Sequence, residues 1–391
     1  MLENELDRLL NEDISSVINR EKYSFDKFAE PFGKSLVLFG AGNLGRRVLA
    51  RLRQERIEPL CFADNNPGLW GSDIDGIKVL SPEDAAEKYG DRAAFIVAIC
   101  THSGHRFALT KKKLTALNCR KVISFVSFFW KYSDSFLPDY YIDLPHKIIE
   151  NADSIKKAFN LLGDEDSQNT FLTQLKWRII ENYDELPGSS ITSQYFPDDI
   201  FQLTSDEIFV DCGAFNGDTI KEFLQRQGES FGKIIAFEPD PLNFSALSKY
   251  VENFSSNLKN RVAVFQKAVG LGESKLKFFG TGTPSSLVSE RGDIEVDCID
   301  LDHTLATCNP TYIKMDIEGA EIDALAGARR IIEKDRPVLG ICVYHRQDHL
   351  WRIPLLISSL SNDYKIFLRP YSDEGWELVC YAVPINRLKN I

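Results

Sequence analysis

The sequence predicts an α/β protein with two Rossmann-like domains. Short apolar runs alternate with segments of helical length in two separate parts of the chain, and a glycine-rich turn follows the first apolar run of each part. This alternation is typical of parallel sheets, because parallel strands need crossover connections and are covered on both faces. The length of 391 residues corresponds to two or three domains.

A helix is expected before the first alternating series. Leu6, Leu10 and Val17 are among the apolar residues that recur there at helical spacing, which indicates one amphipathic helix. We therefore expect an N-terminal helix at 1–30, a Rossmann-like nucleotide-binding domain at 31–145, a helical bridge at 146–200 and a second Rossmann-like domain at 201–391.

The first series alternates predicted strands and helices. In order, its segments are SLVLFG, GRRVLARLRQER, PLCFADNN, SPEDAAEKYG, AAFIVAIC, RFALTKKKLTAL and KVISFVSFF. The bridge that follows contains two predicted helices, DSIKKAFNLLG and SQNTFLTQLKWRIIENY, separated at Gly163 and Asp164.

A glycine-rich loop follows the first strand of this series. Gly40, Gly42 and Gly45 form G-x-G-x-x-G, with Asn43 inside it, and Asp64 ends the next strand 64 − 45 = 19 residues after the last glycine. Such a loop lets a phosphate approach a helix N-terminus, while the acid binds ribose. We expect a nucleotide or nucleotide-sugar here; the alternative is a Rossmann domain retained for packing or dimerisation.

The second series ends in two strands without a crossover between them. Its segments are EIFVDCGA, TIKEFLQRQ, KIIAFEPD, LNFSALSKYVENF, RVAVFQKAVG, KLKFFG, EVDCIDLD, TYIKMDIEG, EIDALAGARRIIEK, PVLGICVYH, YKIFLR and ELVCYAVP. Only a short loop around Glu374 separates the last two, so they are expected to form an antiparallel hairpin.

The second glycine-rich turn also joins a strand to a helix. Gly213 and Gly217 would let the backbone approach a ligand closely. Glu238 lies at the tip of the next strand, 238 − 211 = 27 residues after Asp211, where a carboxylate can accept hydrogen bonds from ribose hydroxyls. The turn predicts a nucleoside ligand.

The missing features narrow the choice of nucleoside. The turn is neither G-x-G-x-x-G nor a Walker loop, which disfavours a pyrophosphate. Acids at Asp211, Asp218, Glu238 and Asp240 suit the sulfonium and ammonium groups of S-adenosylmethionine. The alternative is that these acids only cap helix and strand ends.

The order of motifs in this part resembles FkbM-type S-adenosylmethionine-dependent methyltransferases. The motifs are VDCGAFNGDT, AFEPDPLNF, KAVG, Ser285-Ser286, VDCIDLD, YIKMDIEGAEIDALAGA and a strand ending in VYH. The resemblance spans roughly residues 194–383 and implies a class I methyltransferase sheet and methyl transfer to an oxygen of a sugar or secondary metabolite. It leaves the acceptor open. More loosely, FADNNPGLWGSDIDGIKVLSPEDA resembles the nucleotide-binding domain that precedes some bacterial sugar-modifying enzymes.

The resemblance also implies site residues. The methionyl part of the cofactor would be surrounded by Asp211, Gly213, Ala214, Gly217 and Asp218. The ribose would lie at Glu238, near Asp240, and the adenine beside Lys267 and Ala268. Asp316 and Glu318 would face the methyl group.

A base is expected because an unactivated hydroxyl is a poor nucleophile. The candidates are Asp316, Glu318 and His345, since neighbouring strand tips converge on the ligand crevice. His349, four residues after His345, has no assigned role. No metal site is assigned, although a divalent ion near Asp316 is an open alternative.

Composition narrows the class of partner. Lys and Arg number 46 and Asp and Glu 57, a net charge of 46 − 57 = −11, which disfavours a nucleic acid or an anionic membrane as partner. The acidic start and the absence of a long apolar run favour a cytoplasmic protein. We expect a small-molecule acceptor, with a homo-oligomer left open, and eight reduced cysteines as core residues.

Two other functions compete with methyl transfer. The N-terminal domain could be an NAD-dependent oxidoreductase or epimerase, but the one Tyr-x-x-x-Lys, at Tyr23 and Lys27, precedes the first strand. A non-catalytic nucleotide-binding scaffold is also disfavoured. Clustered acids at strand tips repel one another and cost stability, so a site without a function would be expected to lose them. A cluster of Cys100, His102 and His105 is interpreted as a polar rim rather than a metal site.

Overall fold

The computed structural model describes residues 1–101, 105–186, 193–278 and 294–389. It divides into two compact units. The first comprises Met1–Ala152, Leu172–Ser189 and Ser372–Trp376, and the second comprises Asp153–Phe171, Ser190–Tyr371 and Glu377–Ile391. The segment 146–200 therefore contributes to both units, and the loop of the last hairpin belongs to the first.

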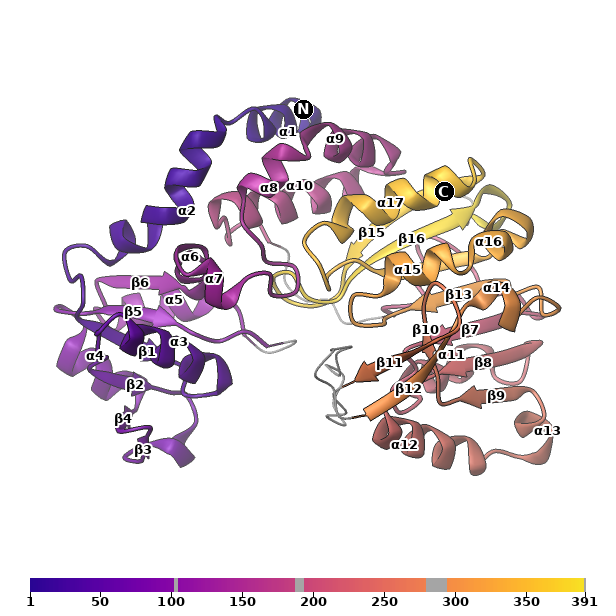
Figure 1. The fold of residues 1–391 in the computed structure, drawn as a ribbon, viewed down its shortest axis with the longest axis horizontal. Helices are drawn as coiled ribbons and strands as arrows, with labels where there is room; N and C mark the ends of the chain where they lie inside the picture. Colours follow the sequence, from indigo (N-terminus) through magenta and orange to yellow (C-terminus); the bar gives the residue numbers. More distant parts are fainter. Residues whose placement is uncertain (102–104, 187–192, 279–293, 390–391) are drawn as a thin grey trace. The chain divides into compact units, whose positions relative to one another are not determined.

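The first unit contains a six-stranded sheet with the order β3-β4-β2-β1-β5-β6. Its elements are α1 (Leu2–Leu10), α2 (Ile14–Ala29), β1 (Leu36–Phe39), α3 (Asn43–Gln54), β2 (Cys61–Ala63), η1 (Pro67–Leu69), β3 (Asp73–Ile74), β4 (Ile77–Leu80), α4 (Pro82–Tyr89), β5 (Ala94–Val97), α5 (Phe107–Ala116), β6 (Lys121–Ser124), α6 (Phe125–Lys131), α7 (Ser133–Phe136) and α8 (His146–Glu150). Only the β3–β4 pair is antiparallel, and Figure 1 shows the strands in this order from β6 to β3. The parallel sheet predicted for this part is confirmed.

Two local predictions in the first unit are wrong. The N-terminal helix is interrupted, because Asp13 accepts a hydrogen bond from the Ser16 N–H at 2.9 Å and starts a second helix. The apolar run after Lys121 is a strand only as far as Ser124. The hydroxyl of Ser124 accepts from the Val126 N–H at 3.1 Å and caps α6, so a side-chain cap overrides the apolar pattern.

The second unit contains a seven-stranded sheet with the order β15-β16-β14-β13-β7-β8-β9. The two bridge helices are α9 (Ala152–Leu161) and α10 (Glu165–Ile180). The remaining elements are β7 (Ile208–Cys212), α11 (Asp218–Gln227), β8 (Lys233–Phe237), α12 (Pro241–Glu252), α13 (Ser256–Lys259), β9 (Val262–Phe265), β10 (Ala268–Val269), β11 (Ser274–Phe278), β12 (Ile294–Ile299), α14 (Leu301–Thr304), β13 (Tyr312–Met315), α15 (Glu321–Ala326), α16 (Arg329–Asp335), β14 (Val338–Cys342), α17 (His349–Leu360), β15 (Tyr364–Pro370), β16 (Leu378–Pro384) and η2 (Ile385–Arg387).

The last hairpin enters this sheet as predicted. Strands β14, β13, β7, β8 and β9 are parallel, whereas β16 pairs antiparallel with both β14 and β15. Figure 1 shows the series from the yellow hairpin to β9. The predicted α/β fold with two Rossmann-like sheets, the second ending in an antiparallel hairpin, is confirmed.

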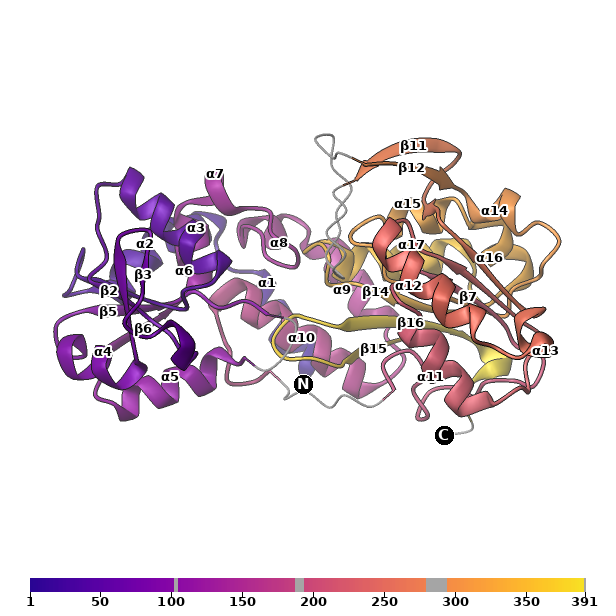
Figure 2. The ribbon, with the colours of Figure 1, turned by 90° about the horizontal axis from the view of Figure 1, so that it is seen from below.

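Three strands of the second unit form a separate small sheet. Its order is β10-β12-β11, with β11 and β12 antiparallel, and Figure 2 shows this pair standing apart from the large sheet. Ala268, Val296 and Cys298 form its buried core. The sequence placed these runs in the main alternating series, because alternation alone does not distinguish one sheet from two.

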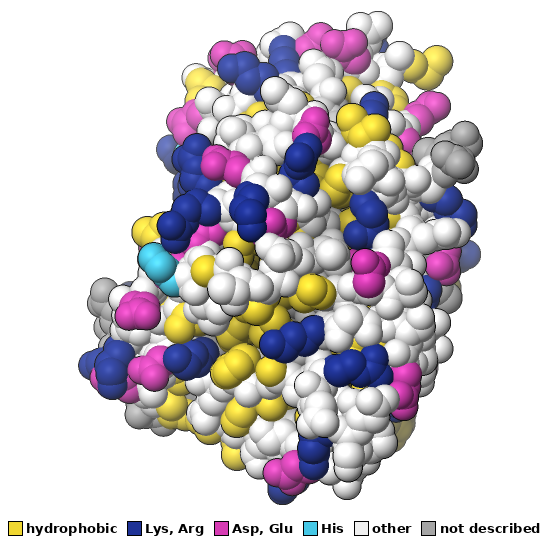
Figure 3. All heavy atoms as spheres, turned by 90° about the vertical axis from the view of Figure 1, so that its right-hand side faces the viewer, with side chains coloured by type: hydrophobic (Ala, Val, Ile, Leu, Met, Phe, Trp, Pro, Cys, Tyr) yellow, Lys and Arg dark blue, Asp and Glu magenta, His cyan; other side chains and the backbone are white. Residues whose placement is uncertain are grey.

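The surface carries mixed charges. On the face shown in Figure 3, Lys and Arg side chains are interspersed with Asp and Glu rather than gathered in one patch. Within the described ranges, none of the helices combines the length and apolar character that crossing a bilayer requires. All eight cysteines are free thiols, and all but Cys100 and Cys308 are buried.

Candidate active site

Four adjacent parallel strands bring the predicted site residues to one edge of the sheet. Strand β7 pairs with β8 and β13, and β13 pairs with β14, all in the same direction. Glu238 follows β8, Asp316 follows β13, and His345 lies three residues after β14. The carboxyl ends of these strands form the usual ligand-binding edge of an α/β sheet.

The glycines of the loop after β7 are required by contacts inside the protein. Gly213 has φ +80°, and a Cβ there would lie 1.9 Å from the carbonyl oxygen of Asp316. Gly217 has φ +90°, and its Cβ would lie 2.8 Å from the ring of Tyr250. Both glycines therefore make room for the neighbouring loop and helix, and their close approach to a ligand stays a prediction.

Asp211 lies near the end of β7, before this loop, and pairs with a buried lysine. Its side chain has no exposed surface, and Oδ1 is 3.0 Å from Nζ of Lys314 on β13. The same ammonium donates to the Gly213 carbonyl at 2.6 Å. Burial raises the pKa of Asp211 to about 6 although Lys314 opposes the rise, whereas Asp211 and Asp316 together hold the pKa of Lys314 above its ordinary value despite burial. This buried pair supports the loop through the hydrogen bond from Lys314 to Gly213.

Glu238 joins the first two loops of the sheet edge. Its Oε2 accepts from the Phe215 N–H at 2.8 Å and its Oε1 from the Asp240 N–H at 2.9 Å. Burial raises the pKa of Glu238 to about 7, and these two N–H groups partly oppose the rise. Asp240 is fully buried and accepts from the Leu242 N–H at 2.8 Å, so it caps α12, which was the alternative interpretation of this acid.

The other residues predicted for cofactor binding surround these loops. Ala214 is buried, and its N–H donates to the Phe237 carbonyl at 3.0 Å. Asp218 is exposed at the first turn of α11. Lys267 and Ala268 follow β9, and Ala268 begins the small sheet.

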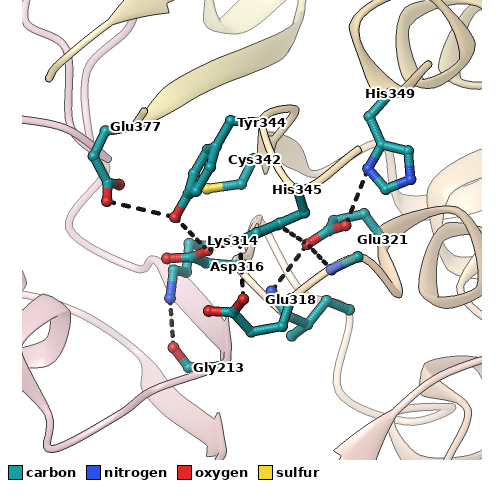
Figure 4. A network of polar contacts seen from close by, with 12 residues as sticks. Gly213, Lys314, Asp316, Glu318, Glu321, Cys342, Tyr344, His345, His349 and Glu377 are labelled. Atoms are coloured by element: carbon teal, nitrogen blue, oxygen red, sulfur yellow. Dashed lines mark hydrogen bonds and ion pairs between the residues drawn. The ribbon is translucent and has the colours of Figure 1, made fainter. Parts of the chain in front are cut away.

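Two tyrosine hydroxyls and the ring of His345 lie around the carboxylate of Asp316, and Figure 4 shows Tyr344 and His345 beside it. The Tyr195 hydroxyl donates to Oδ2 at 2.9 Å, and the Tyr344 hydroxyl lies 3.3 Å from Oδ1. Nε2 of His345 is also 3.3 Å from Oδ1. The predicted meeting of Asp316 and His345 on neighbouring strand tips is confirmed, because these side chains are in contact.

His345 is held from its other side by Glu321. Nδ1 of His345 lies 2.7 Å from Glu321 Oε1, and Nδ1 of His349 lies 3.2 Å from Glu321 Oε2. Burial disfavours the charged ring, but Glu321 above all, with Glu318 and Asp316, raises the pKa of His345 to about 10. Burial likewise opposes ionisation of Glu321, but the two histidines hold its pKa well below the ordinary value. His345 is therefore an imidazolium at neutral pH.

Glu318 completes the cluster from the loop after β13. It has φ +56°, its side chain is 15% exposed, and its Oε2 is buried without a hydrogen-bond partner, 3.8 Å from His345 Nε2. Burial, assisted by Asp316, Glu321 and Glu377, raises the pKa of Glu318 to about 8, and His345 opposes the rise. A positive φ at a residue other than glycine is a strained conformation that is often found at functional sites.

Several members of the cluster were not predicted. They are Lys314, Glu321, Tyr195, Tyr344 and Glu377. Glu321 and Lys314 stand in the quoted motif YIKMDIEGAE, so their proximity to the strand tip was a usable signal. Tyr195 reaches the site from the segment before β7, and nothing local in the sequence points to that contact.

A metal centre is not formed by the described residues, among which no group of three His, Cys, Asp or Glu side chains could hold an ion. Cys100 and His105 have separate partners: Cys100 Sγ lies 3.6 Å from the Tyr141 hydroxyl, and His105 Nε2 lies 3.0 Å from the Thr110 hydroxyl. His102 and the Ser285-Ser286 pair lie outside the described residues.

At one glycine of the N-terminal glycine loop, an added side chain would meet open space. A Cβ at Gly42 meets nothing within 4 Å, whereas a Cβ at Gly45 would lie 1.9 Å from the Gly40 carbonyl. Gly42 precedes α3, which has no side-chain cap. Asp64 accepts from the Ala41 N–H at 2.8 Å, so it closes the loop as well as ending β2.

One solved structure shares this architecture over nearly the whole chain. Residues 211–366 match the family model of the methyltransferase FkbM domain. The crystal structure of a methyltransferase FkbM from Methylobacillus flagellatus KT matches with a TM-score of 0.76 and 21% identity, covering 95% of this chain and 99% of that one. Fibrillarin from Aeropyrum pernix, in complex with natively bound S-adenosyl-L-methionine, matches with a TM-score of 0.30 and 11% identity, over 46% of this chain and 69% of that one. No curated protein matches the chain.

Proposed function

We propose that this chain, which carries an FkbM methyltransferase domain at residues 211–366, transfers a methyl group from S-adenosylmethionine to a hydroxyl oxygen of a small molecule. One observation carries the proposal. Nε2 of His345 lies 3.3 Å from Asp316 and 3.8 Å from Glu318, at the same sheet edge as Glu238. A carboxylate for a ribose and a polar cluster for a reacting group thus lie on adjacent strands.

The residues present suit this cofactor. Each oxygen of Glu238 accepts one backbone N–H and keeps a lone pair with which it can accept a ribose hydroxyl. Glu318 offers a buried oxygen without a hydrogen-bond partner, and Asp218 and Asp316 add negative charge for a cationic ligand. When bound, S-adenosylmethionine supplies an electrophilic methyl group.

The chain contributes position and a proton acceptor. Holding two reactants at near-attack distance provides a large part of the rate enhancement of a displacement at carbon. Asp316 and Glu318 are the carboxylates placed to accept a hydrogen bond from the acceptor hydroxyl. His345 is an imidazolium at neutral pH, so its proposed part is to hold these acids rather than to act as the base.

A sugar hydroxyl is the acceptor that the surroundings favour. The cluster is bordered by the hydroxyls of Tyr195 and Tyr344 and by the carboxylate of Glu377, 3.4 Å from the Tyr344 hydroxyl. Hydroxyls and carboxylates in such density suit a ligand with several hydroxyl groups.

Methyl transfer is tested with the full chain, labelled S-adenosylmethionine and a panel of free and nucleotide-linked sugars. We expect a sugar-dependent rise in S-adenosylhomocysteine and a labelled O-methyl product. A panel that includes amine and thiol acceptors distinguishes the alternatives: transfer to nitrogen or sulfur alone would contradict the proposed O-methylation.

We also propose that the N-terminal glycine loop binds a phosphate of a nucleotide or nucleotide-sugar. The open space at Gly42 and the uncapped start of α3 support this proposal. A helix N-terminus with free N–H groups attracts anions.

A further inference from the structure

We propose that Glu318 is the catalytic base, which is ionised when the cationic cofactor binds and takes the proton of the acceptor hydroxyl as the methyl group is transferred. This inference rests on the proposed function. It chooses one base among the three candidates, which are Asp316, Glu318 and His345.

His345 is excluded as the base by its contacts. Both of its ring nitrogens face carboxylates: Nδ1 is 2.7 Å from Glu321 and Nε2 is 3.3 Å from Asp316. Its side chain is 1% exposed, so an acceptor reaches neither nitrogen without displacing an acid. An imidazole between two carboxylates keeps both protons and acts as a fixed cation. Glu321 is then a positioning residue, because it holds His345 and the loop after β13 rather than a reacting group.

Asp316 is less suited because its oxygens already have donors. Tyr195 donates to Oδ2, while Tyr344 and His345 face Oδ1. Taking a proton would disrupt this set of contacts. Asp316 is better suited to orient the acceptor.

Glu318 has the free oxygen that a base needs. Its Oε2 makes no hydrogen bond, and the side chain as a whole is 15% exposed, against 1% for His345. Figure 4 shows its carboxylate turned toward Asp316, on the side of the cluster that faces the Gly213 loop. The charged and titratable groups around it are His345, Asp316, Glu321 and Glu377.

The charges balance in this scheme. A bond forms between the acceptor oxygen and the methyl carbon while the carbon–sulfur bond breaks, and its electron pair stays on sulfur. The hydroxyl proton passes to Glu318. One positive charge on sulfur and one negative charge on Glu318 disappear together, so the step leaves no new unpaired charge in the site.

The same charges couple the base to the cofactor. The pKa of Glu318 is raised to about 8, so without ligand the carboxyl is mostly protonated at pH 7.5. A cation within about 4–6 Å lowers the pKa of a carboxyl by about 1–3. Both ligands carry the α-ammonium group, but only S-adenosylmethionine carries a sulfonium, whereas S-adenosylhomocysteine has a neutral thioether. Only the methyl donor should therefore ionise Glu318.

Titration calorimetry in buffers of different ionisation enthalpy tests the predicted ionisation of Glu318 without measuring turnover. With the full chain at pH 7.5, we expect S-adenosylmethionine to release up to roughly 0.75 proton more than S-adenosylhomocysteine, since a carboxyl of pKa about 8 is protonated to about that fraction. Protons released from Glu238 are common to both ligands, because both contain the ribose. The difference should decrease toward zero above about pH 9, where Glu318 is already ionised in the free protein.

Glu318→Gln should abolish the difference while its affinity for S-adenosylhomocysteine stays within about twofold, which reports an intact pocket. Glu252→Gln, on the exposed end of α12, should keep the wild-type difference. Equal proton release with the two ligands in the wild-type protein, or a difference that persists in Glu318→Gln, would overturn the inference. If neither ligand binds the wild-type protein, the proposed function itself fails.

Discussion

Nδ1 of His345 lies 2.7 Å from Oε1 of Glu321 inside the protein, where neither side chain is more than 1% exposed. Glu321 also accepts from the Ile317 N–H at 3.0 Å and contacts His349, so one buried carboxylate joins the loop after β13 to the loop after β14 and to α17. The protonated His345, which borders Asp316 and Glu318, is thus held in place by Glu321, which is not one of the reacting groups.

We expect Glu321→Gln to destabilise the protein by about 3–5 kcal/mol, because removing one partner leaves a buried charge uncompensated. Urea unfolding measures this. Glu333→Gln, on the exposed surface of α16, is the matched control and should change the free energy of unfolding by less than about 0.5 kcal/mol. Equal stability of the two variants would contradict the buried ion pair.

The pH dependence of stability should follow His345. The pKa of His345 is raised to about 10 in the folded protein, so its stabilising contribution is complete below its ordinary pKa, near 6.5, and is lost as the pH rises through 10. We expect the free energy of unfolding to fall between pH 7 and 10 more steeply in the wild-type protein than in His345→Gln. Parallel curves over this range would show that His345 is not an imidazolium.

The Lys314–Asp211 pair yields a double-mutant test. Lys314→Met removes the partner of a fully buried carboxylate and the donor to the Gly213 carbonyl, so we expect a loss of about 3–5 kcal/mol. Adding Asp211→Asn should recover part of it, because the unpaired charge is then absent. If the double variant is as unstable as the sum of the two single variants, the pair is not coupled.

The N-terminal loop is tested by two glycine substitutions with opposite expectations. Gly42→Val meets open space and has an ordinary φ of −76°, so it should fold normally and abolish the thermal shift caused by a nucleoside diphosphate. Gly45→Ala would collide with the Gly40 carbonyl and should lower the melting temperature without any ligand. If a nucleoside diphosphate shifts the melting of neither the wild-type chain nor Gly42→Val, the first unit serves packing.

The sequence predicts strand direction and strand tips better than it predicts contacts. Alternating runs and the short loop around Glu374 were sufficient for the two parallel sheets and the final hairpin. The meeting of Asp316 and His345 followed because adjacent parallel strands end at one edge. These features depend on chain direction and connection length, which are local.

The contacts that could not be predicted join residues that are far apart in the sequence. Asp211 stays a predicted site residue, but its pairing with Lys314, on a neighbouring strand, was not predicted. Asp240 also stays a predicted site residue, and its side chain caps α12. The protonation of His345 depends on Glu321, 24 positions earlier, and no spacing rule links a strand-tip histidine to the first residue of another helix.

Binding of S-adenosylmethionine with Glu238 at its ribose tests the proposed function most directly. Isothermal titration of the full chain should show binding, and Glu238→Ala should weaken it at least tenfold, because hydrogen bonds to a charged acceptor contribute about 1.5–3 kcal/mol each. Glu252→Ala, on the exposed end of α12, should bind as the wild-type protein does. No binding by the wild-type chain, or undiminished affinity in a folded Glu238→Ala variant, would contradict the proposed site.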